Sequence, residues 1–275
     1  MTTNEQAPHQ TVAGSGPVLL DVVGHVAHIQ LNRPQAANGL DNDLLKALHE
    51  VLMTVHGDPQ VRAVLLSGKG ANFCAGGDVH LFASKGEALP DYLRQATSYL
   101  YVVMSALIHL NAPVVAAVQG FAAGGGGMGL VCASDFVVAA ASSKYLAGAT
   151  RVGMAPDAGL SVTLPALVGM RKAMEMLMTN PTVTAQEALA MGLVTRVVAD
   201  AALLDEAMTL AQELARQAPQ AMVATKRLLW SGLGLGVDAA MPEESRTVAA
   251  LSATADVREG LAAVIERRAP KFTGR

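Results

Sequence analysis

Three continuous apolar runs constrain the fold of this chain more than any other feature. They are VRAVLLSG (61–68), APVVAAVQG (112–120) and DFVVAAA (135–141). Apolar runs without polar alternation are typical of strands that are buried on both faces, as parallel strands are. Helical patterns lie between these runs, over 42–57 and over 90–110. The alternation predicts an α/β domain in which helices cover a mainly parallel sheet.

The flanking segments predict further elements. Residues 18–24 and 25–32 alternate in polarity and predict a hairpin that turns at Gly24 and His25, whereas residues 1–16 are expected to form a disordered leader. After residue 160 the pattern is helical. Thr184 and Glu187 match a capping box, Gly192 is placed to end that helix, and Pro219 is placed to begin another.

Two groups of apolar residues after residue 160 need a packing partner. The region 200–275 carries broad apolar stripes, which we expect to pack on a partner subunit or back on the core. Four methionines follow each other closely in one predicted helix, and we expect them to fill gaps in the core. They are Met170, Met174, Met176 and Met178.

Composition excludes several classes of protein. A chain of 275 residues with 51% hydrophobic content can bury a large core, and its formal charge of −3 leaves no basic footprint for nucleic acid. The first 16 residues lack the features of a signal peptide, and no apolar run is long enough to span a membrane. Cys74 and Cys132 are too far apart for a C-x-x-C motif and too few for a disulfide framework. We expect a cytoplasmic protein with no metal site.

The glycine-rich stretch FAAGGGGMGL (121–130) matches G-x-G-x-x-G through Gly124, Gly126 and Gly129. A dinucleotide loop also requires an acidic residue about 20 positions later, but that region contains SSKYLAGAT (142–150). The loop also lies in the middle of the chain, and it lacks the G-K-[ST] of a P-loop. The glycines therefore need another explanation.

A second glycine loop, CAGGDV (74–79), offers that explanation. Both glycine loops follow a predicted buried strand and precede a helix. Backbone N–H groups in such positions have no ladder partner and lie at the positive end of a helix dipole. Two such groups from adjacent loops can form an oxyanion hole for a carbonyl that becomes an enolate, and glycine lets the substrate approach the backbone.

Six segments together resemble the enoyl-CoA hydratase/isomerase (crotonase) family in their order and spacing. The resemblance covers residues 18–272, and the segments are LNRPQAANGL, ANFCAGGDV, APVVAAVQGFAAGGGGMGL, GMAPDAGLSVTLP, TAQEALAMGLV and ATADVREGLAAVIERRAPKF. It implies a crotonase-like spiral of ββα units over 17–199, followed by a helical trimerisation region over 200–275. It also implies an acyl-CoA thioester as substrate and a homotrimer or a dimer of trimers, with no resident cofactor because coenzyme A enters with the substrate.

The resemblance also implies roles for individual residues. The N–H groups of Gly77 and Gly125 would form the oxyanion hole. Other positions would contact the substrate: Ala36, Ala75, Asp78 and Val79 along the path of coenzyme A, and Phe121 and Gly126 around the acyl group. For Asp78 we favour the other role that its position allows, which is to cap the following helix. Arg267, Arg268 and Lys271 would lie near the coenzyme A phosphates of the same or a neighbouring subunit, or would belong to a solvated tail.

The chain departs from the family pattern at both hydratase glutamates. Hydratases that the chain resembles hold water with two glutamates, and Met128 and Ala149 occupy those positions. Neither side chain can transfer a proton. One carboxylate remains in the region, Asp157 in a Pro-Asp-x-Gly turn, a sequence that some double-bond isomerases of this family share and that is also common turn chemistry. His80 we expect to face solvent.

These observations favour an acyl-CoA double-bond isomerase in which Asp157 shuttles the proton. A 1,3-proton shift needs only one base, because the same group removes the proton and returns it. Two alternatives stay open: a hydratase with a non-standard base, and a catalytically weak acyl-CoA-binding protein.

Overall fold

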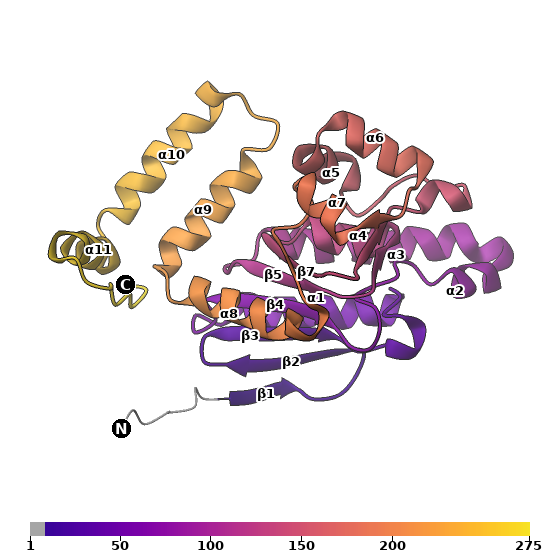
Figure 1. The fold of residues 1–275 in the computed structure, drawn as a ribbon, viewed down its shortest axis with the longest axis horizontal. Coiled ribbons are helices and arrows are strands. Elements are labelled where there is room, and N and C mark those ends of the chain that lie inside the picture. Colours follow the sequence, from indigo (N-terminus) through magenta and orange to yellow (C-terminus); the bar gives the residue numbers. More distant parts are fainter. Residues whose placement is uncertain (1–8) are drawn as a thin grey trace.

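The computed structural model describes residues 9–275, and it contains two sheets with helices around them (Figure 1). The large sheet has seven strands in the order β1-β2-β3-β4-β5-β7-β10. Their bounds are β1 His9–Ala13, β2 Val18–Val23, β3 Val26–Leu31, β4 Ala63–Gly68, β5 Val114–Val118, β7 Phe136–Ala140 and β10 Arg196–Val198. The first three strands pair antiparallel and the rest pair parallel, as the three apolar runs predicted.

A second, smaller sheet has three strands. It contains β6 (Phe121–Ala123), β8 (Lys144–Leu146) and β9 (Val183–Thr184), in the order β6-β8-β9. An isolated bridge between Cys74 and Ala122 extends this pairing to the loop after β4. Successive turns of the chain therefore contribute one strand to each sheet before a helix follows, which is the expected spiral of ββα units.

Helices cover both faces of the large sheet. On one face lie α1 (Asn42–Gly57) and α3 (Leu89–Ile108), whose buried residues join the larger hydrophobic core. On the other face lies α8 (Leu203–Ala215), which packs on β4, β5 and β7 through a second core. The remaining helices of the layered body are α2 (Val79–Ser84), α4 (Gly124–Cys132), α5 (Leu160–Val168), α6 (Met170–Thr179) and α7 (Ala185–Ala190), with short 3-10 turns at 34–36, 86–88, 149–152 and 200–202.

Three more helices form an arm that leaves the layered body (Figure 1). They are α9 (Pro219–Ser231), α10 (Val237–Leu251) and α11 (Ala255–Glu266), and we call them the helical arm. Within the region 200–275, α8 packs on the sheet, and the helical arm begins at Pro219. No helix within residues 9–275 is long and apolar enough to cross a membrane.

The local signals of the sequence correspond to observed structure in several places. The hairpin turns at Gly24 and His25, since Val23 pairs with Val26 across it. Thr184 and Glu187 form the capping box at the start of α7, and Pro219 is the first residue of α9.

Two expectations about packing differ from the structure. Residues 9–13 form strand β1, which pairs with β2 and is reinforced by a 2.7 Å hydrogen bond from Thr11 Oγ1 to Asp21 Oδ1. The disordered leader expected over residues 1–16 is therefore wrong for residues 9–13, and residues 1–8 lie outside the described residues. Of the four methionines, only Met176 is buried, whereas the other three project from α6 and are more than half exposed.

Candidate active site

The two glycine loops lie against each other at the ends of β4 and β5. Ala123 N donates to Cys74 O at 2.9 Å, and Cys74 N donates to Phe121 O at 3.1 Å. Gly76 and Gly124 both have positive φ, and a Cβ on Gly76 would stand 2.5 Å from the carbonyl oxygen of Ala123. Only glycine permits this approach, so the glycines bring the two loops into direct backbone contact.

Each remaining glycine of the run 124–129 faces a different close neighbour. A Cβ on Gly125 would overlap Asp157 Oδ1, and a Cβ on Gly126 would overlap Leu40 Cδ1. On Gly127 and Gly129 it would overlap the Cys74 carbonyl and the Ala158 side chain. The run therefore starts helix α4 at Gly124 and allows this helix to pack tightly, whereas the sequence predicted a glycine loop that precedes the helix.

Two backbone N–H groups are available beside this junction. Gly125 is the second residue of α4, where the N–H has no acceptor one turn earlier in the helix. Gly77 N–H donates to no acceptor within the described residues, although its neighbour Gly76 accepts from Leu40 N at 2.7 Å. Gly77 lies under the ring of Phe82, which leaves no room for a side chain there.

A cavity of about 380 Å³ opens over these groups. Gly77, Gly125 and Asp157 all line it, together with Ala75, Val79 and Gly126. Most of the other lining side chains are apolar and come from α1, α2, α3 and the segment 146–155: Leu45, Phe82, Leu93, Ala96, Leu100, Leu146, Ala149, Val152, Met154 and Ala155. Six of the residues that the sequence singled out for the site therefore lie around one cavity.

Asp157 enters the cavity from a tight turn. Leu160 N donates to Asp157 O at 3.0 Å, and both central residues, Ala158 and Gly159, have positive φ. The carboxylate lies against Gly125 and is open to the cavity, yet nearby protein atoms displace much of its hydration. This desolvation raises the pKa of Asp157 above its ordinary value, and it outweighs the hydrogen bond from the residue's own backbone, which lowers the pKa.

Asp78 acts as a helix cap. Its Oδ1 accepts from Leu81 N at 3.0 Å and so caps α2, while Arg33 approaches its other oxygen at 3.9 Å. Arg33 also forms a 2.9 Å ion pair with Asp41, the cap of α1. Ala36 lies beside Asp78 across Gly39. Arg33 therefore ties the starts of α1 and α2 together, a link that nothing in the sequence indicated.

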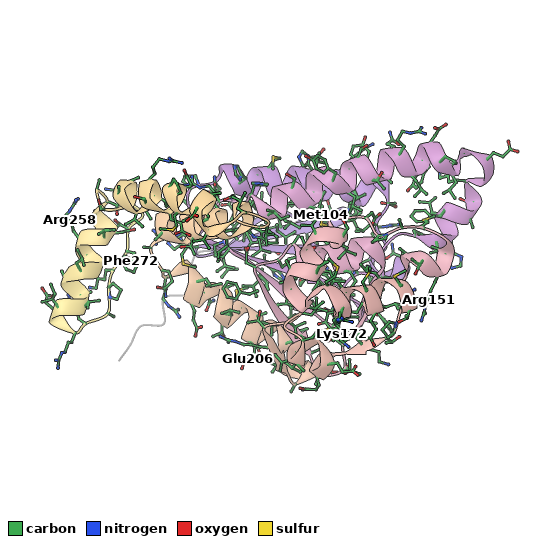
Figure 2. The ribbon with its side chains drawn as sticks, turned by 90° about the horizontal axis from the view of Figure 1, so that it is seen from above. Met104, Arg151, Lys172, Glu206, Arg258 and Phe272 are labelled. Carbon is green, nitrogen blue, oxygen red and sulfur yellow. The ribbon has the colours of Figure 1, made fainter. Side chains whose placement is uncertain are left out.

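Like Ala36 and Asp78, two further expected site residues do not line the cavity. Phe121 is not among the described residues that line the cavity, because its ring turns toward Lys144 Nζ, 5.8 Å from the ring centre. Lys271 lies on the C-terminal segment beside the helical arm, where its backbone N–H donates to Glu259 at 2.8 Å. Figure 2 shows its neighbour Phe272 at the opposite end of the molecule from Arg151 of the cavity wall. Neither residue serves the cavity of its own chain.

The positions of the hydratase glutamates have different surroundings. Met128 is fully buried in α4, outside the cavity wall that the described residues form, whereas Ala149 lines the cavity. The cavity wall contains two charged residues among those described, Asp157 and Arg151. The sequence analysis did not name Arg151. Arg151 lies two residues after Ala149, one of the expected glutamate positions, and this proximity could have indicated it.

This arrangement defines what the site can do chemically. Two unpaired N–H groups can stabilise negative charge on an oxygen, and a single carboxylate with a raised pKa can accept and return a proton. Both operate in a cavity whose other walls are mostly apolar, where electrostatic interactions are stronger than in water.

Known proteins of similar sequence and structure belong to one family. Residues 22–275 match the family model for enoyl-CoA hydratase/isomerase. The chain is 36% identical to (E)-benzylidenesuccinyl-CoA hydratase of Thauera aromatica over 94% of this chain and 99% of that protein. It is 32% identical to 1,2-epoxyphenylacetyl-CoA isomerase of Escherichia coli over 94% and 98% of the two chains.

Solved structures agree with this result. The crystal structure of enoyl-CoA hydratase from Bacillus anthracis superimposes with a TM-score of 0.89 at 32% identity, covering 94% of this chain and all of the other. The crotonase-like fold expected from the sequence motifs is thereby confirmed. The chain belongs to the enoyl-CoA hydratase/isomerase family, whose members act on acyl-CoA thioesters.

Proposed function

We propose that this enzyme moves a carbon–carbon double bond in an enoyl-CoA thioester. The observation that carries the proposal is the position of Asp157, which is the only carboxylate of the described residues lining the cavity and lies against Gly125. One carboxylate is sufficient for a 1,3-proton shift, whereas the two-glutamate mechanism of hydration lacks both of its groups at Met128 and Ala149.

The reaction would proceed in two proton transfers. The Asp157 carboxylate removes a proton from C2 of a 3-enoyl thioester, and the electron pair moves into the carbonyl to form a dienolate. The N–H groups of Gly77 and Gly125 donate to the dienolate oxygen and stabilise it. The protonated Asp157 then returns the proton at C4, which yields the conjugated 2-enoyl thioester and restores the carboxylate.

The raised pKa of Asp157 suits this role. Desolvation weakens the preference of the carboxyl group for its charged form, so the group becomes a stronger base toward a carbon acid. Ala75 and Val79, which line the cavity beside Gly77, support a path for the thioester between α2 and the glycine loop.

The test replaces Asp157 with asparagine. Asp157→Asn keeps the shape of the side chain and removes the base, so isomerisation of a 3-enoyl-CoA should fall by about 10² to 10⁴-fold. Thermal stabilisation by an acyl-CoA should persist, because the amides remain. Hydration of the matching 2-enoyl-CoA is measured on the same two proteins.

Three outcomes distinguish the alternatives. Equal isomerase rates in both proteins would overturn the role of Asp157. Faster hydration than isomerisation in the wild type would favour a hydratase with a non-standard base, an activity that the name of the Thauera aromatica relative also raises. Binding of acyl-CoA without isomerisation or hydration would indicate an acyl-CoA-binding protein.

A further inference from the structure

Arg151 is a cation in the wall of a mainly apolar cavity. It lies in the 3-10 turn Ala149–Val152, and it shares the cavity with Asp157. Thr97 also lines the cavity, but its hydroxyl already donates to Leu93 O at 2.7 Å. Arg151 is therefore the one lining side chain, among the described residues, that offers uncommitted charged donors.

The guanidinium group is held in place from one side. Arg151 Nη2 donates to the backbone carbonyl of Asn180 at 2.7 Å. Asn180 is itself buried, and its side chain accepts from Gly148 N at 2.7 Å and donates to Thr150 Oγ1 at 2.6 Å. The anchor of Arg151 is thus part of a fixed network on both sides of the turn, which reduces the entropy lost when its other N–H groups bind a ligand.

The charge of Arg151 is not neutralised by the protein. Arg151 forms no ion pair with any residue from 9 to 275. Asp157 is not its partner, and a close guanidinium would lower the pKa of that carboxyl group, whereas the pKa of Asp157 is raised. A guanidinium has five N–H donors in a planar fork that fits a carboxylate. One donor is used, and a carboxylate in the cavity would take two of the others.

We propose that Arg151 selects acyl groups that carry a second carboxylate, so that the preferred substrates are thioesters of dicarboxylic acids. The inference rests on the proposed function for the thioester part of the ligand. It adds the chemistry of the far end of the acyl group, which would lie in the same mainly apolar cavity as Arg151.

Equilibrium binding of unreactive ligands provides the test. The ligands are glutaryl-, adipoyl- and suberoyl-CoA, each compared with the analogue in which the free carboxylate is a neutral carboxamide. The three lengths place the free carboxylate at three different distances from the thioester. Isothermal titration calorimetry at fixed ionic strength should show about tenfold tighter binding of the carboxylate for at least one length, because its hydrogen bonds to the guanidinium are charge-assisted.

Variants assign the preference to Arg151. Arg151→Met should abolish the preference of the best carboxylate over its carboxamide. Arg151→Gln should also abolish the preference. It keeps a donor for the Asn180 carbonyl, so a lost preference in this variant cannot be attributed to misfolding of the turn 149–152. The control is Arg171→Met, which removes the same charge from the exposed surface of α6 and should keep the preference.

The outcomes are separate from those of the isomerase test. Equal affinity of the carboxylate and the carboxamide at all three lengths would overturn the proposal, as would a preference that survives in both Arg151 variants. Because saturated thioesters do not isomerise, loss of the role of Asp157 would leave this result unaffected.

Discussion

The proposed site depends on Gly125 in two ways. Its N–H lies free at the start of α4, and its Cα lies against the carboxylate of Asp157. A side chain at this position would push the carboxylate away from the amide. The proposed base and the proposed oxyanion hole therefore depend on the same missing Cβ.

Gly125→Ala should reduce isomerase turnover by about 10²-fold, because a displacement of about 1 Å in a catalytic group has an effect of that size. Gly57→Ala is the control, since no atom lies within 4 Å of its Cβ position and it is the last residue of α1. Steady-state rates and thermal melts of both variants are compared with the wild type. Turnover of Gly125→Ala within twofold of the wild type would contradict the arrangement.

The raised pKa of Asp157 predicts two effects of pH. Only the ionised base accepts a proton, so kcat/KM should rise with pH through an apparent pKa above the ordinary 3.8 of aspartate. The profile is measured with a 3-enoyl-CoA in buffers of constant ionic strength. An apparent pKa at or below 3.8 would contradict the desolvation of this carboxylate.

The same pKa predicts the stability of Asp157→Asn. A carboxyl group with a raised pKa in the folded state favours folding below its ordinary pKa, and this contribution is lost as the pH rises through the folded-state pKa. At pH 7 the wild type therefore carries a desolvated charge that asparagine lacks. Asp157→Asn should melt at a higher temperature at pH 7, and the advantage should shrink toward pH 3.5. A variant that is less stable at pH 7 would disagree with this sign.

Among the helices, α9 is fixed to the layered body by a buried ion pair. Lys226 Nζ lies 2.8 Å from Asp135 Oδ2 and also donates to the carbonyls of Leu107 and Ala112. The other oxygen of Asp135 accepts from Trp230 Nε1 at 2.9 Å. Burial lowers the pKa of Lys226, and the charge of Asp135 opposes that effect. The arm is thus attached to the body where α3 ends.

Lys226→Met should destabilise the protein by about 3–5 kcal/mol, because it leaves Asp135 buried without its partner charge. The control is Arg227→Met, one residue further along α9, whose exposed pair with Glu243 should contribute only about 0–1 kcal/mol. Urea unfolding followed by circular dichroism gives both values. A loss below 1 kcal/mol for Lys226→Met would show that the pair does not anchor the arm.

For the molecule as a whole, the helical arm presents apolar side chains that the chain itself does not cover. Leu229, Val237, Val248, Val264 and Ile265 are each 66% exposed or more. Patches of this kind mark protein–protein contacts. Together with the resemblance described above, they support our proposal of a trimer or a dimer of trimers.

Val264→Glu combined with Ile265→Glu should shift the protein toward monomers, because each change places a charge in the proposed interface. Val12→Glu, on strand β1, is the control. Sedimentation velocity at micromolar concentration measures all three proteins. A wild-type monomer would contradict the assembly.

In an assembly, a neighbouring arm would also offer Arg267 and Lys271 to coenzyme A, whereas Arg268 is already paired with Glu259 and Glu266.

Local chemistry made much of the fold predictable from the chain alone. The apolar runs became parallel strands, Thr184 and Glu187 became a capping box, and Pro219 began a helix. Three of the four methionines of α6 are exposed and do not fill the core as predicted, because the periodicity of a helix identifies an apolar face but not what covers it.

The sequence by itself determined which groups are available to the site: two glycine loops after buried strands, one carboxylate in a turn, and no glutamate at positions 128 and 149. Only the tertiary structure decided that Asp157 lies against Gly125, that the ring of Phe121 contacts Lys144 and not the cavity, and that Arg151 lines the cavity with no ion-pair partner in the described part of the chain. The physical reason is that strand and helix patterns arise from neighbours in the chain. The contacts of Asp157 and Arg151 span roughly 30 residues and depend on how loops from both sheets pack together.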